Sequence, residues 1–330
     1  MKIETLICVL APSCSTRSAL SIMLAFLILD ATLVAPLPLP SRAVVRCPVL
    51  VMEAADPPSM AQTAMRGPLT ATGSGKPLTR DELAEVKKEL EEIKSKYNLK
   101  EPERSFMDGD DIKWRYGGSP DYSLTNMRFL KGRTTQHAEG SLELIVENLV
   151  KTWEMERSHK VDPQQHQSVD PSTFTIAANG WKKFNNDEAN TVGNYNVLMA
   201  GCPANVWDAD NIGWEQSHEK FHDAFAAFPW EVLEVFSGPP SVAFSWRHWA
   251  TFTGTYEGNQ GKGELVELFG FGVATVNDKL QLVDVDIYYK PEQFIKVLKG
   301  ELPVESLKNA QTIMGPAVAG ACPHLASLTE

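Results

Sequence analysis

Residues 218–222 read HEKFH, which matches the H-E-x-x-H pattern of zinc proteases. In those enzymes two histidines, one helical turn apart, bind Zn²⁺, and the glutamate acts as general base. His218 and His222 would be the ligands here, and Glu219 would be the base. The residues around the motif decide whether this chemistry is possible.

These surroundings argue against a zinc protease. The motif lies on a predicted helix whose apolar residues are spaced 4, 3, 4 and 3, and His218 belongs to that stripe. The stripe consists of Trp214, His218, Phe221, Phe225 and Phe228. A metzincin would continue with H-x-x-G-x-x-H, but the chain continues with HDAFAAF. We therefore interpret His218 and His222 as histidines of a core or pocket wall, and we predict no metal and no cofactor.

Several helices are predicted around this motif. Thr79 and Glu82 form a Thr-x-x-Glu capping box, which is typical of the start of a helix. Ser141 is the expected cap of a second helix, whose apolar stripe includes Trp153. The predicted helices cover residues 79–97, 141–160, 187–199 and 214–228. We expect residues 100–135 to be mostly loop, since Gly and Pro interrupt them.

The hydrophobic pattern changes after Pro229. WEVLEVF, SVAFSWRHWATFTGTY, ELVELFGFGVATV and KLQLVDVDIYY are rich in β-branched and aromatic residues, and turn sequences separate them. Helices followed by a four-stranded meander indicate an α+β domain in which a sheet covers a layer of helices. We expect residues 106–300 to form this domain and residues 301–330 to be a mobile tail.

The charge distribution excludes one class of partner. The 330 residues carry a net charge of −11. Residues 1–76 are slightly basic, with six Lys/Arg and four Asp/Glu, so the acidic surplus belongs to the remainder. An acidic domain without a basic stripe repels a phosphate backbone. We therefore expect no nucleic-acid partner.

The first 76 residues are typical of a targeting presequence. Residues 19–29 form an apolar run behind Arg17, of a length that fits a signal-peptide core better than a membrane span. A Ser-, Ala- and Pro-rich segment with few acids follows, as in transit peptides. The combination predicts delivery to a plastid in two steps, with secretion or a retained anchor as alternatives. We exclude residues 1–76 from the fold, expect no membrane contact after their removal, and assign residues 77–105 to an amphipathic helix and linker.

Three stretches resemble a known family. WRYGGSPDY, EGSLELIVENLVKTWEMERSHKV and FSGPPSVAFSWRHWATFTGTYEGNQGKG are similar to the plant pathogen-related proteins, of the SnoaL-like branch of the NTF2-like superfamily. The resemblance covers residues 106–298. It implies an NTF2-like cone, in which helices pack on a strongly curved antiparallel sheet and enclose a pocket. It also makes a homodimer a reasonable expectation.

In the related cyclases a carboxylate on the last strand removes a proton α to a carbonyl. Asp286 on the last predicted strand is the candidate for this base, although the Trp-x-x-Asp pattern common in cyclases is missing. Alternation places Asp284, Asp286, Tyr288 and Lys290 on one face, and Val283, Val285, Ile287 and Tyr289 on the other. The open alternative is that the acidic face is solvated and the apolar face points inward.

His248 and His218 are the other catalytic candidates. Trp246, His248 and Phe252 share one strand face, so His248 would be a proton relay near Asp286 if that face lines the pocket; a structural histidine is the alternative. Glu156 would reach the pocket, join a network or form a surface salt bridge. The predicted pocket residues are Trp153, Glu156, Trp214, His222, Phe225, Trp246, Phe252, Phe269 and Tyr288.

Two functions are consistent with these residues. The first is a pocket that binds a small lipophilic molecule without turnover. The second is a cofactor-free cyclase or isomerase acting on a polyketide- or terpenoid-like substrate. An enzyme needs titratable groups that converge inside the cavity, whereas a binding protein needs only an apolar cavity.

Overall fold

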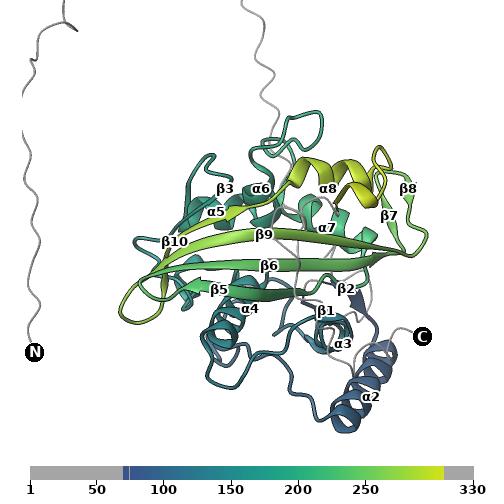
Figure 1. Ribbon diagram of the computed structural model, residues 1–330, viewed down its shortest axis with the longest axis horizontal. Coiled ribbons are helices and arrows are strands. Elements are labelled where there is room, and N and C mark those ends of the chain that lie inside the picture. Colours follow the sequence, from purple (N-terminus) through teal and green to yellow (C-terminus); the bar gives the residue numbers. More distant parts are fainter. Residues whose placement is uncertain (1–69, 74, 308–330) are drawn as a thin grey trace, which may run out of the picture. The chain divides into compact units, whose positions relative to one another are not determined.

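The structure is a computed structural model that describes residues 70–73 and 75–307 (Figure 1). As predicted, the fold is α+β, with helices packed against a six-stranded sheet. The strand order is β4-β3-β10-β9-β6-β5, and only the pair of β10 and β3 is parallel. The strands are β3 (Thr175–Ala178), β4 (Phe184–Asn185), β5 (Trp230–Ser237), β6 (Ser241–Phe252), β9 (Glu264–Val276) and β10 (Leu282–Tyr288).

The predicted four-stranded meander is confirmed as β5, β6, β9 and β10. The expected turn between the last two strands forms, with the Leu280 amide donating to the Asn277 carbonyl at 2.9 Å. Two elements were not predicted: β3 and β4 extend the sheet beyond β10, and a two-stranded ribbon of β7 (Thr255–Tyr256) and β8 (Asn259–Gln260) follows β6.

The strongest helix predictions are also confirmed. In α2 (Arg80–Tyr97) the Thr79 hydroxyl accepts from the Glu82 amide at 3.3 Å and the Glu82 carboxylate accepts from the Thr79 amide at 2.9 Å, which completes the capping box. α4 (Leu142–His159) begins after Ser141, whose hydroxyl accepts from the Leu144 amide. α7 (Trp214–Ala224) contains HEKFH and ends before the predicted Phe228.

The helix predicted over residues 187–199 is divided in two, α5 (Asn186–Val192) and α6 (Asn194–Met199). Gly193 separates them with a φ of 88°, and a Cβ atom there would lie 2.6 Å from Cδ1 of Trp214. Glycine is therefore required both by the backbone conformation and by the indole beside it.

Three helical segments were not predicted: α3 (Ser123–Gly132), the 3₁₀ helix η1 (Pro163–Gln165) and α8 (Pro291–Leu298). α3 lies in the segment expected to be loop. Leu124, Met127 and Leu130 form a short apolar stripe on this helix, but within the described residues no side chain caps its start. The stripe is only two turns long and follows Gly and Pro, so it was not predicted. α2 packs against α3, with Leu90 and Ile93 in a small core next to Leu130.

Residues at both ends of the described chain belong to the fold. β1 (Thr70–Thr72) and β2 (Gly75–Leu78) form a ribbon, in which Thr72 is buried and its carbonyl accepts from the Thr125 hydroxyl at 3.0 Å. Leu307 is also buried in the main core. The exclusion of residues 70–73, 75 and 76 from the fold was therefore wrong. The expectation of a mobile tail was wrong for residues 301–307. The predicted signal core and the rest of the presequence and tail lie outside the described residues.

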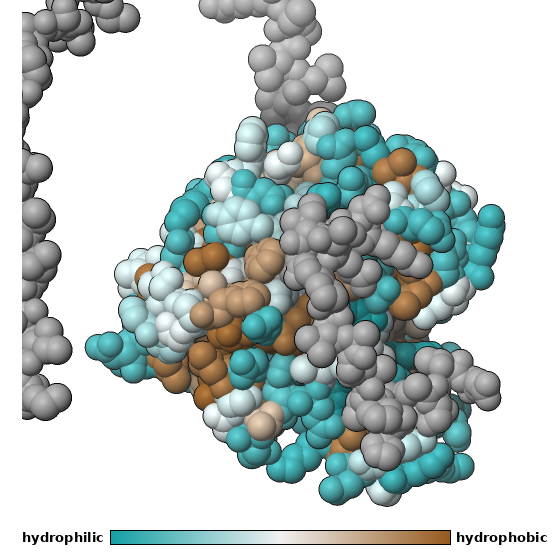
Figure 2. Space-filling model, in the orientation of Figure 1, coloured by the Kyte–Doolittle hydropathy of each residue, from teal (hydrophilic) through white to brown (hydrophobic). Residues whose placement is uncertain are grey.

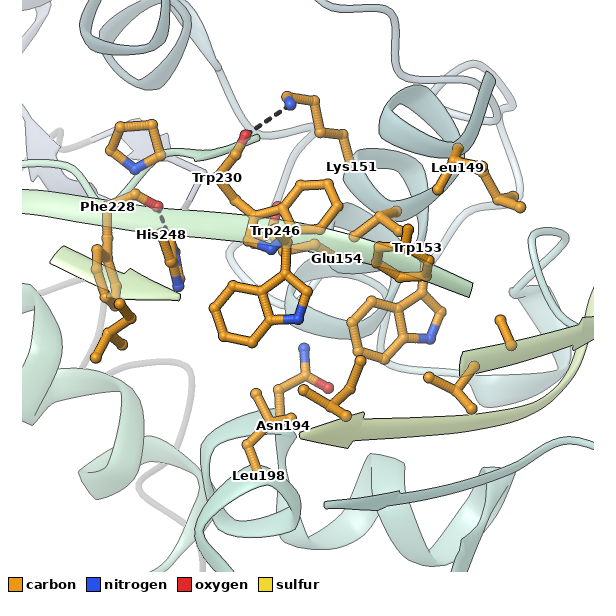
Figure 3. Close-up of a pocket in the computed structure, with 18 of the residues that line it drawn as sticks. Leu149, Lys151, Trp153, Glu154, Asn194, Leu198, Phe228, Trp230, Trp246 and His248 are labelled. Carbon is orange, nitrogen blue, oxygen red and sulfur yellow. Dashed lines mark hydrogen bonds between the residues drawn. The ribbon is translucent and has the colours of Figure 1, made fainter. Parts of the chain in front are cut away.

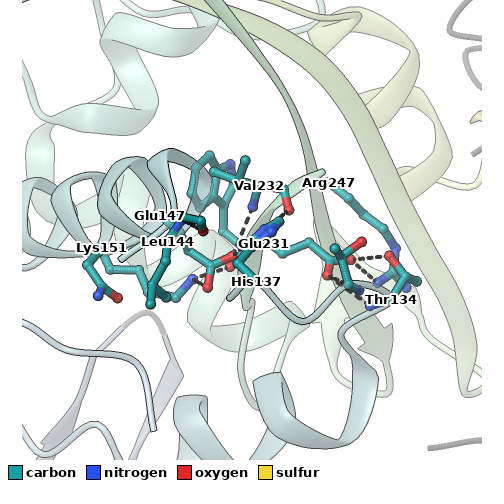
Figure 4. Close-up of polar contacts among 12 residues, drawn as sticks. Thr134, His137, Leu144, Glu147, Lys151, Glu231, Val232 and Arg247 are labelled. Atoms are coloured by element: carbon teal, nitrogen blue, oxygen red, sulfur yellow. Dashed lines mark hydrogen bonds and ion pairs between the residues drawn. The ribbon is translucent and has the colours of Figure 1, made fainter. Parts of the chain in front are cut away.

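Side chains, and not another strand, cover the outer edge of β5 (Figure 4). The Lys151 ammonium donates to the Trp230 carbonyl at 2.7 Å, and His137 Nε2 donates to the Val232 carbonyl at 2.9 Å. The Val232 amide donates to the Glu147 carboxylate at 3.1 Å. The backbone groups of Trp230 and Val232 that face away from β6 are thus hydrogen-bonded to side chains.

The face of the sheet turned away from the helices carries exposed apolar side chains. Figure 2 shows them gathered over β5, β6 and β9, and they include Phe236, Phe271 and Val273. The homodimer expected from the resemblance stays a prediction. Within residues 70–73 and 75–307, no helix is long and apolar enough to cross a membrane.

Candidate ligand-binding site

A cavity of about 190 Å³ lies between the inner face of the sheet and the helices (Figure 3). Strands β6, β9 and β10 form one wall with inward side chains such as Phe244, Trp246, Leu268, Val285 and Ile287. α3, α4 and α6 form the opposite wall together with Arg104, and Phe294 of α8 also contributes. The cavity therefore lies between the sheet and the helical layer, and a pocket for a ligand stays a prediction.

Two glycines of β9 make room for the aromatic rings of β6. A Cβ atom on Gly270 would lie 2.3 Å from Cζ2 of Trp246, and one on Gly272 would lie 2.3 Å from Cζ of Phe244. These rings can cross the neighbouring strand only because both positions lack a side chain. The alternation FGFG in the sequence thus places Trp246 and Phe244 in the cavity wall.

Lys151 on α4 is a buried cation in the helical wall. Its ammonium donates to the Trp230 carbonyl, lies 3.5 Å from the Glu147 carboxylate and sits 4.1 Å from the ring centre of Phe129. Burial lowers the pKa of Lys151 to about 8, and Glu147 opposes this effect.

Glu154 and Arg104 lie on the same side of the cavity. The Tyr122 hydroxyl donates to the Glu154 carboxylate at 2.9 Å, and burial raises the pKa of Glu154. The Arg104 guanidinium stacks 3.6 Å from the ring centre of Tyr122 and donates to the Asn126 side chain at 2.8 Å. Among residues 70–73 and 75–307, Nε of Arg104 is buried and has no hydrogen-bond partner.

His248 on β6 lines the cavity as a neutral ring. Its Nε2 donates to the Phe228 carbonyl at 2.9 Å, and the imidazole stacks on the Phe228 ring with the centres 3.5 Å apart. Burial lowers the pKa of His248 to about 3. A ring that donates from Nε2 and stays neutral has an unprotonated Nδ1, which is a weak base at this pKa.

Two indole N–H groups in the cavity wall have no acceptor. Nε1 of Trp153 on α4 and Nε1 of Trp246 on β6 are buried without a hydrogen-bond partner in the described structure. Figure 3 shows both indoles together with Asn194 of α6. A buried donor without an acceptor costs about 1–3 kcal/mol, so an acceptor in the cavity would stabilise the protein.

The structure brings three of the predicted site residues into the cavity wall: Trp153, Trp246 and His248. Asp286 is not among them, and the expectation that it faces the pocket is wrong. Its carboxylate accepts from the Gly180 amide at 3.2 Å and from the Tyr288 hydroxyl at 2.9 Å. The predicted alternation holds, but the apolar face of β10, with Val285 and Ile287, points inward.

His218 and His222 line a second, much smaller cavity of about 10 Å³, together with His159 and Glu154. His218 stacks on Trp214 with ring centres 3.7 Å apart and donates from Nδ1 to the Trp214 carbonyl at 2.9 Å. Across the described part of the chain, no group of three or more His, Cys, Asp or Glu side chains is arranged to hold a metal ion.

The remaining predicted pocket residues lie elsewhere. Glu156 is fully buried in a network, where it accepts from the Lys160 ammonium at 2.8 Å and from the Ser168 hydroxyl at 2.6 Å. Its network role, one of the three alternatives, is therefore the correct one. Tyr288 is on the opposite side of the sheet from the cavity, as is Phe269. Phe225 and Phe252 lie in the core outside the cavity wall. Trp214 is half-buried on α7, where it stacks on His218.

The chain is 36% identical over 201 residues to the pathogen-related protein of Hordeum vulgare, a match that covers 58% of this chain and 86% of the barley protein. The chain belongs to the pathogen-related protein family. The resemblance predicted from the three sequence stretches is thus confirmed. No family model matches the chain.

Solved structures similar to this pathogen-related protein include SnoaL-like and NTF2-like proteins. A protein described as a SnoaL-like polyketide cyclase, from Jannaschia sp. CCS1, shares 11% identity over 50% of this chain and 97% of its own, with a TM-score of 0.26. AclR from Streptomyces galilaeus, described as a candidate hydroxylase, shares 14% identity over 48% of this chain and 94% of its own, with a TM-score of 0.31.

Sequence reasoning missed the polar residues of the helical wall. Lys151 and Glu154 lie in the family-typical KTWEME stretch and are three residues apart, so they share a helix face. Charged residues at this spacing are also usual on solvated helices. The available signal was Ser158, four residues further on, which continues this polar face to the end of α4.

Proposed function

We propose that this pathogen-related protein binds a small lipophilic molecule carrying an acceptor oxygen, such as a hydroxyl or carbonyl group. The cavity wall supports this proposal because it is mostly aromatic and aliphatic, with a few polar groups that can orient a ligand. The observation that carries it is the pair of buried indole donors, Trp153 and Trp246, without acceptors.

The size of the cavity limits the ligand. A dry cavity of about 150 Å³ is large enough for benzene. The cavity here, about 190 Å³, would therefore hold a somewhat larger molecule. An eight-carbon ketone such as octan-2-one is a suitable probe, since it has an apolar chain and a single acceptor.

The second function named above, a cyclase or isomerase, loses its predicted base because Asp286 lies outside the cavity. His248, with its pKa lowered to about 3, is a poor substitute. We therefore propose binding and assign no catalytic residue.

Isothermal titration calorimetry with octan-2-one tests the proposal. Ala274 lines the cavity, and Ala274→Phe fills it, so we expect at least about 10-fold weaker binding. Thr275, the next residue of β9, is exposed on the other face, so Thr275→Phe is the matched control and should bind like the wild type. Equal binding by both variants, or no binding by the wild type, would contradict the proposal.

A further inference from the structure

The charged side chains of the cavity lie on its helical wall. Lys151, Glu154 and Ser158 follow one another at helical spacing along α4, and Arg104 is on the same side. The strand wall opposite carries no charged side chain; its polar groups include the neutral ring of His248, the indole N–H of Trp246 and the hydroxyl of Tyr289, which donates to the Leu198 carbonyl. A ligand that matches this asymmetry has an apolar body and one polar end.

Arg104, on the helical side of the cavity, has an N–H donor that is not hydrogen-bonded in the described structure. A guanidinium carries five N–H donors in a planar fork that fits a carboxylate. Nη1 donates to Asn126, but the Nε–H is buried without a partner in the part of the chain that the structure describes. The guanidinium is also held in place by its stacking on Tyr122. The group is therefore positioned to donate to one more acceptor.

Lys151 also has a donor in reserve. Its ammonium has three hydrogens, of which one is directed to the Trp230 carbonyl and another to the Glu147 carboxylate at 3.5 Å. The Glu147 carboxylate is shared, because it also accepts from the Val232 amide. The ammonium also lies 4.1 Å from the ring centre of Phe129, which lines the cavity, so the third hydrogen lies on the side of Lys151 that carries its positive charge towards the cavity wall.

The charges of this wall favour an anion. Its charged residues are two cations, Arg104 and Lys151, and one carboxylate, Glu154. The Tyr122 hydroxyl already donates to Glu154, and burial raises the pKa of this carboxyl group and so favours its neutral form. Glu154 already accepts from Tyr122 and Lys151 is paired with Glu147, so the guanidinium of Arg104 is a buried cation with no carboxylate hydrogen-bonded to it in the described structure.

We propose that the ligand is an apolar carboxylic acid whose carboxylate is bound by Arg104 and Lys151 while its hydrocarbon part lies against the strands. This inference rests on the proposed function and narrows it to one chemical class. Charge-assisted hydrogen bonds to the carboxylate would be the strong polar contacts in such a site. The strand wall would contribute apolar contacts with the hydrocarbon part.

Three eight-carbon probes with the full-length protein at pH 7.5 test it: octanoate, octan-1-ol and octylamine. Their chains bury the same apolar area, so differences in Kd report the polar end. We expect octanoate to bind about 10- to 100-fold more tightly than octan-1-ol, and octylamine to bind most weakly. Octan-1-ol binding as tightly as octanoate would overturn the acid preference but leave the lipophilic pocket intact. No binding by any probe would overturn the pocket as well.

Arg104→Met keeps a long apolar side chain and removes the charge. We expect this variant to lose most of the preference for octanoate, with octan-1-ol binding within about twofold of the wild type. Arg128→Met is the matched control, since Arg128 is exposed on α3 and should leave the preference unchanged. An unchanged octanoate preference in Arg104→Met would overturn the assignment to Arg104. If this variant does not fold, the ranking of the three probes by the wild type still decides the proposal.

Discussion

Lys151 contacts both the cavity and the outer edge of the sheet. Its side chain lines the cavity, while its ammonium is bonded to a β5 carbonyl and paired with Glu147. Both side chains of this pair are about 5% exposed, so the pair is almost completely withdrawn from water. A buried ion pair adds little net stability, but breaking it leaves an uncompensated charge.

Lys151→Met should therefore be strongly destabilising. The buried Glu147 carboxylate loses its cation, and we expect the free energy of unfolding to fall by about 3–5 kcal/mol, measured by urea denaturation at pH 7.5. Lys131→Met, which breaks an exposed pair with Glu89, is the control and should cost at most about 1 kcal/mol.

The double variant Lys151→Met/Glu147→Gln removes both charges and keeps an acceptor for the Val232 amide. It should recover a large part of the stability lost by the single variant. If the double variant is as unstable as Lys151→Met, the unpaired carboxylate is not the cause of the loss.

The role of Lys151 and Glu154 could not be predicted from the sequence. KTWEME alternates charged and apolar residues in a way that fits a half-exposed helix. These charges are buried because Arg104 and the start of α3, which are distant from α4 in the sequence, pack over them. Periodicity identifies the faces of an element, but burial of a polar face depends on tertiary contacts.

At the scale of elements, the sequence was most informative about the strands. Alternation correctly placed Trp246 and His248 on one face of β6, and it correctly separated Asp286 from Val285 on β10. Which face of β10 points inward was left open: the analogy with cyclases suggested the acidic face, and the alternative, a solvated acidic face, is the correct one. Burying the carboxylates of Asp284 and Asp286 would cost free energy, so the apolar face of β10 lies against the core and the acidic face lies outside.

The packing of α4 against α7 predicts a dependence of stability on pH. Burial lowers the pKa of His159 to about 3, of His218 to about 3 and of His222 to about 4. In the unfolded chain a histidine has a pKa of about 6.5, so the unfolded state binds more protons between these values. The stability that the neutral rings contribute is complete above pH 6.5 and is lost as the pH falls towards 3–4.

We therefore expect urea denaturation to show lower stability at pH 5.0 than at pH 7.5. His218→Gln, which cannot titrate, should reduce this decrease by about 2 kcal/mol. The comparison between variant and wild type also removes the opposite contribution of Glu154 and Glu231, whose pKa values burial raises. The same decrease in both proteins would mean that His218 is not protonated on unfolding in this range.

On the scale of the whole molecule, the β1–β2 ribbon extends the fold towards the N-terminus. Thr72 is buried against Thr125, and the Lys76 amide donates to the Ala226 carbonyl at 3.0 Å. This ribbon could not be predicted, because TATGSGKPL combines turn residues with few apolar ones, which is typical of a linker.

A chain that begins at residue 79 should consequently be less stable than one that begins at residue 65. Removal of the ribbon leaves the Thr125 hydroxyl and the Ala226 carbonyl without partners, which should cost at least about 1–3 kcal/mol. A lower midpoint of thermal unfolding for the shorter chain would support this. Identical midpoints would show that the ribbon contributes nothing to stability.

The side chains bound along the start of β5 have a consequence for proteins at high concentration. An open strand edge is a template on which a second molecule can add its own strand, the first step towards amyloid-like aggregates. At Trp230 and Val232 this template is already occupied by the side chains of Lys151, Glu147 and His137. Displacing the Lys151 ammonium from the Trp230 carbonyl would leave a charged group to be buried elsewhere or solvated. The opposite edge of the sheet is only the two-residue β4. We therefore expect the same lysine that lines the cavity to disfavour the addition of a second strand at this edge.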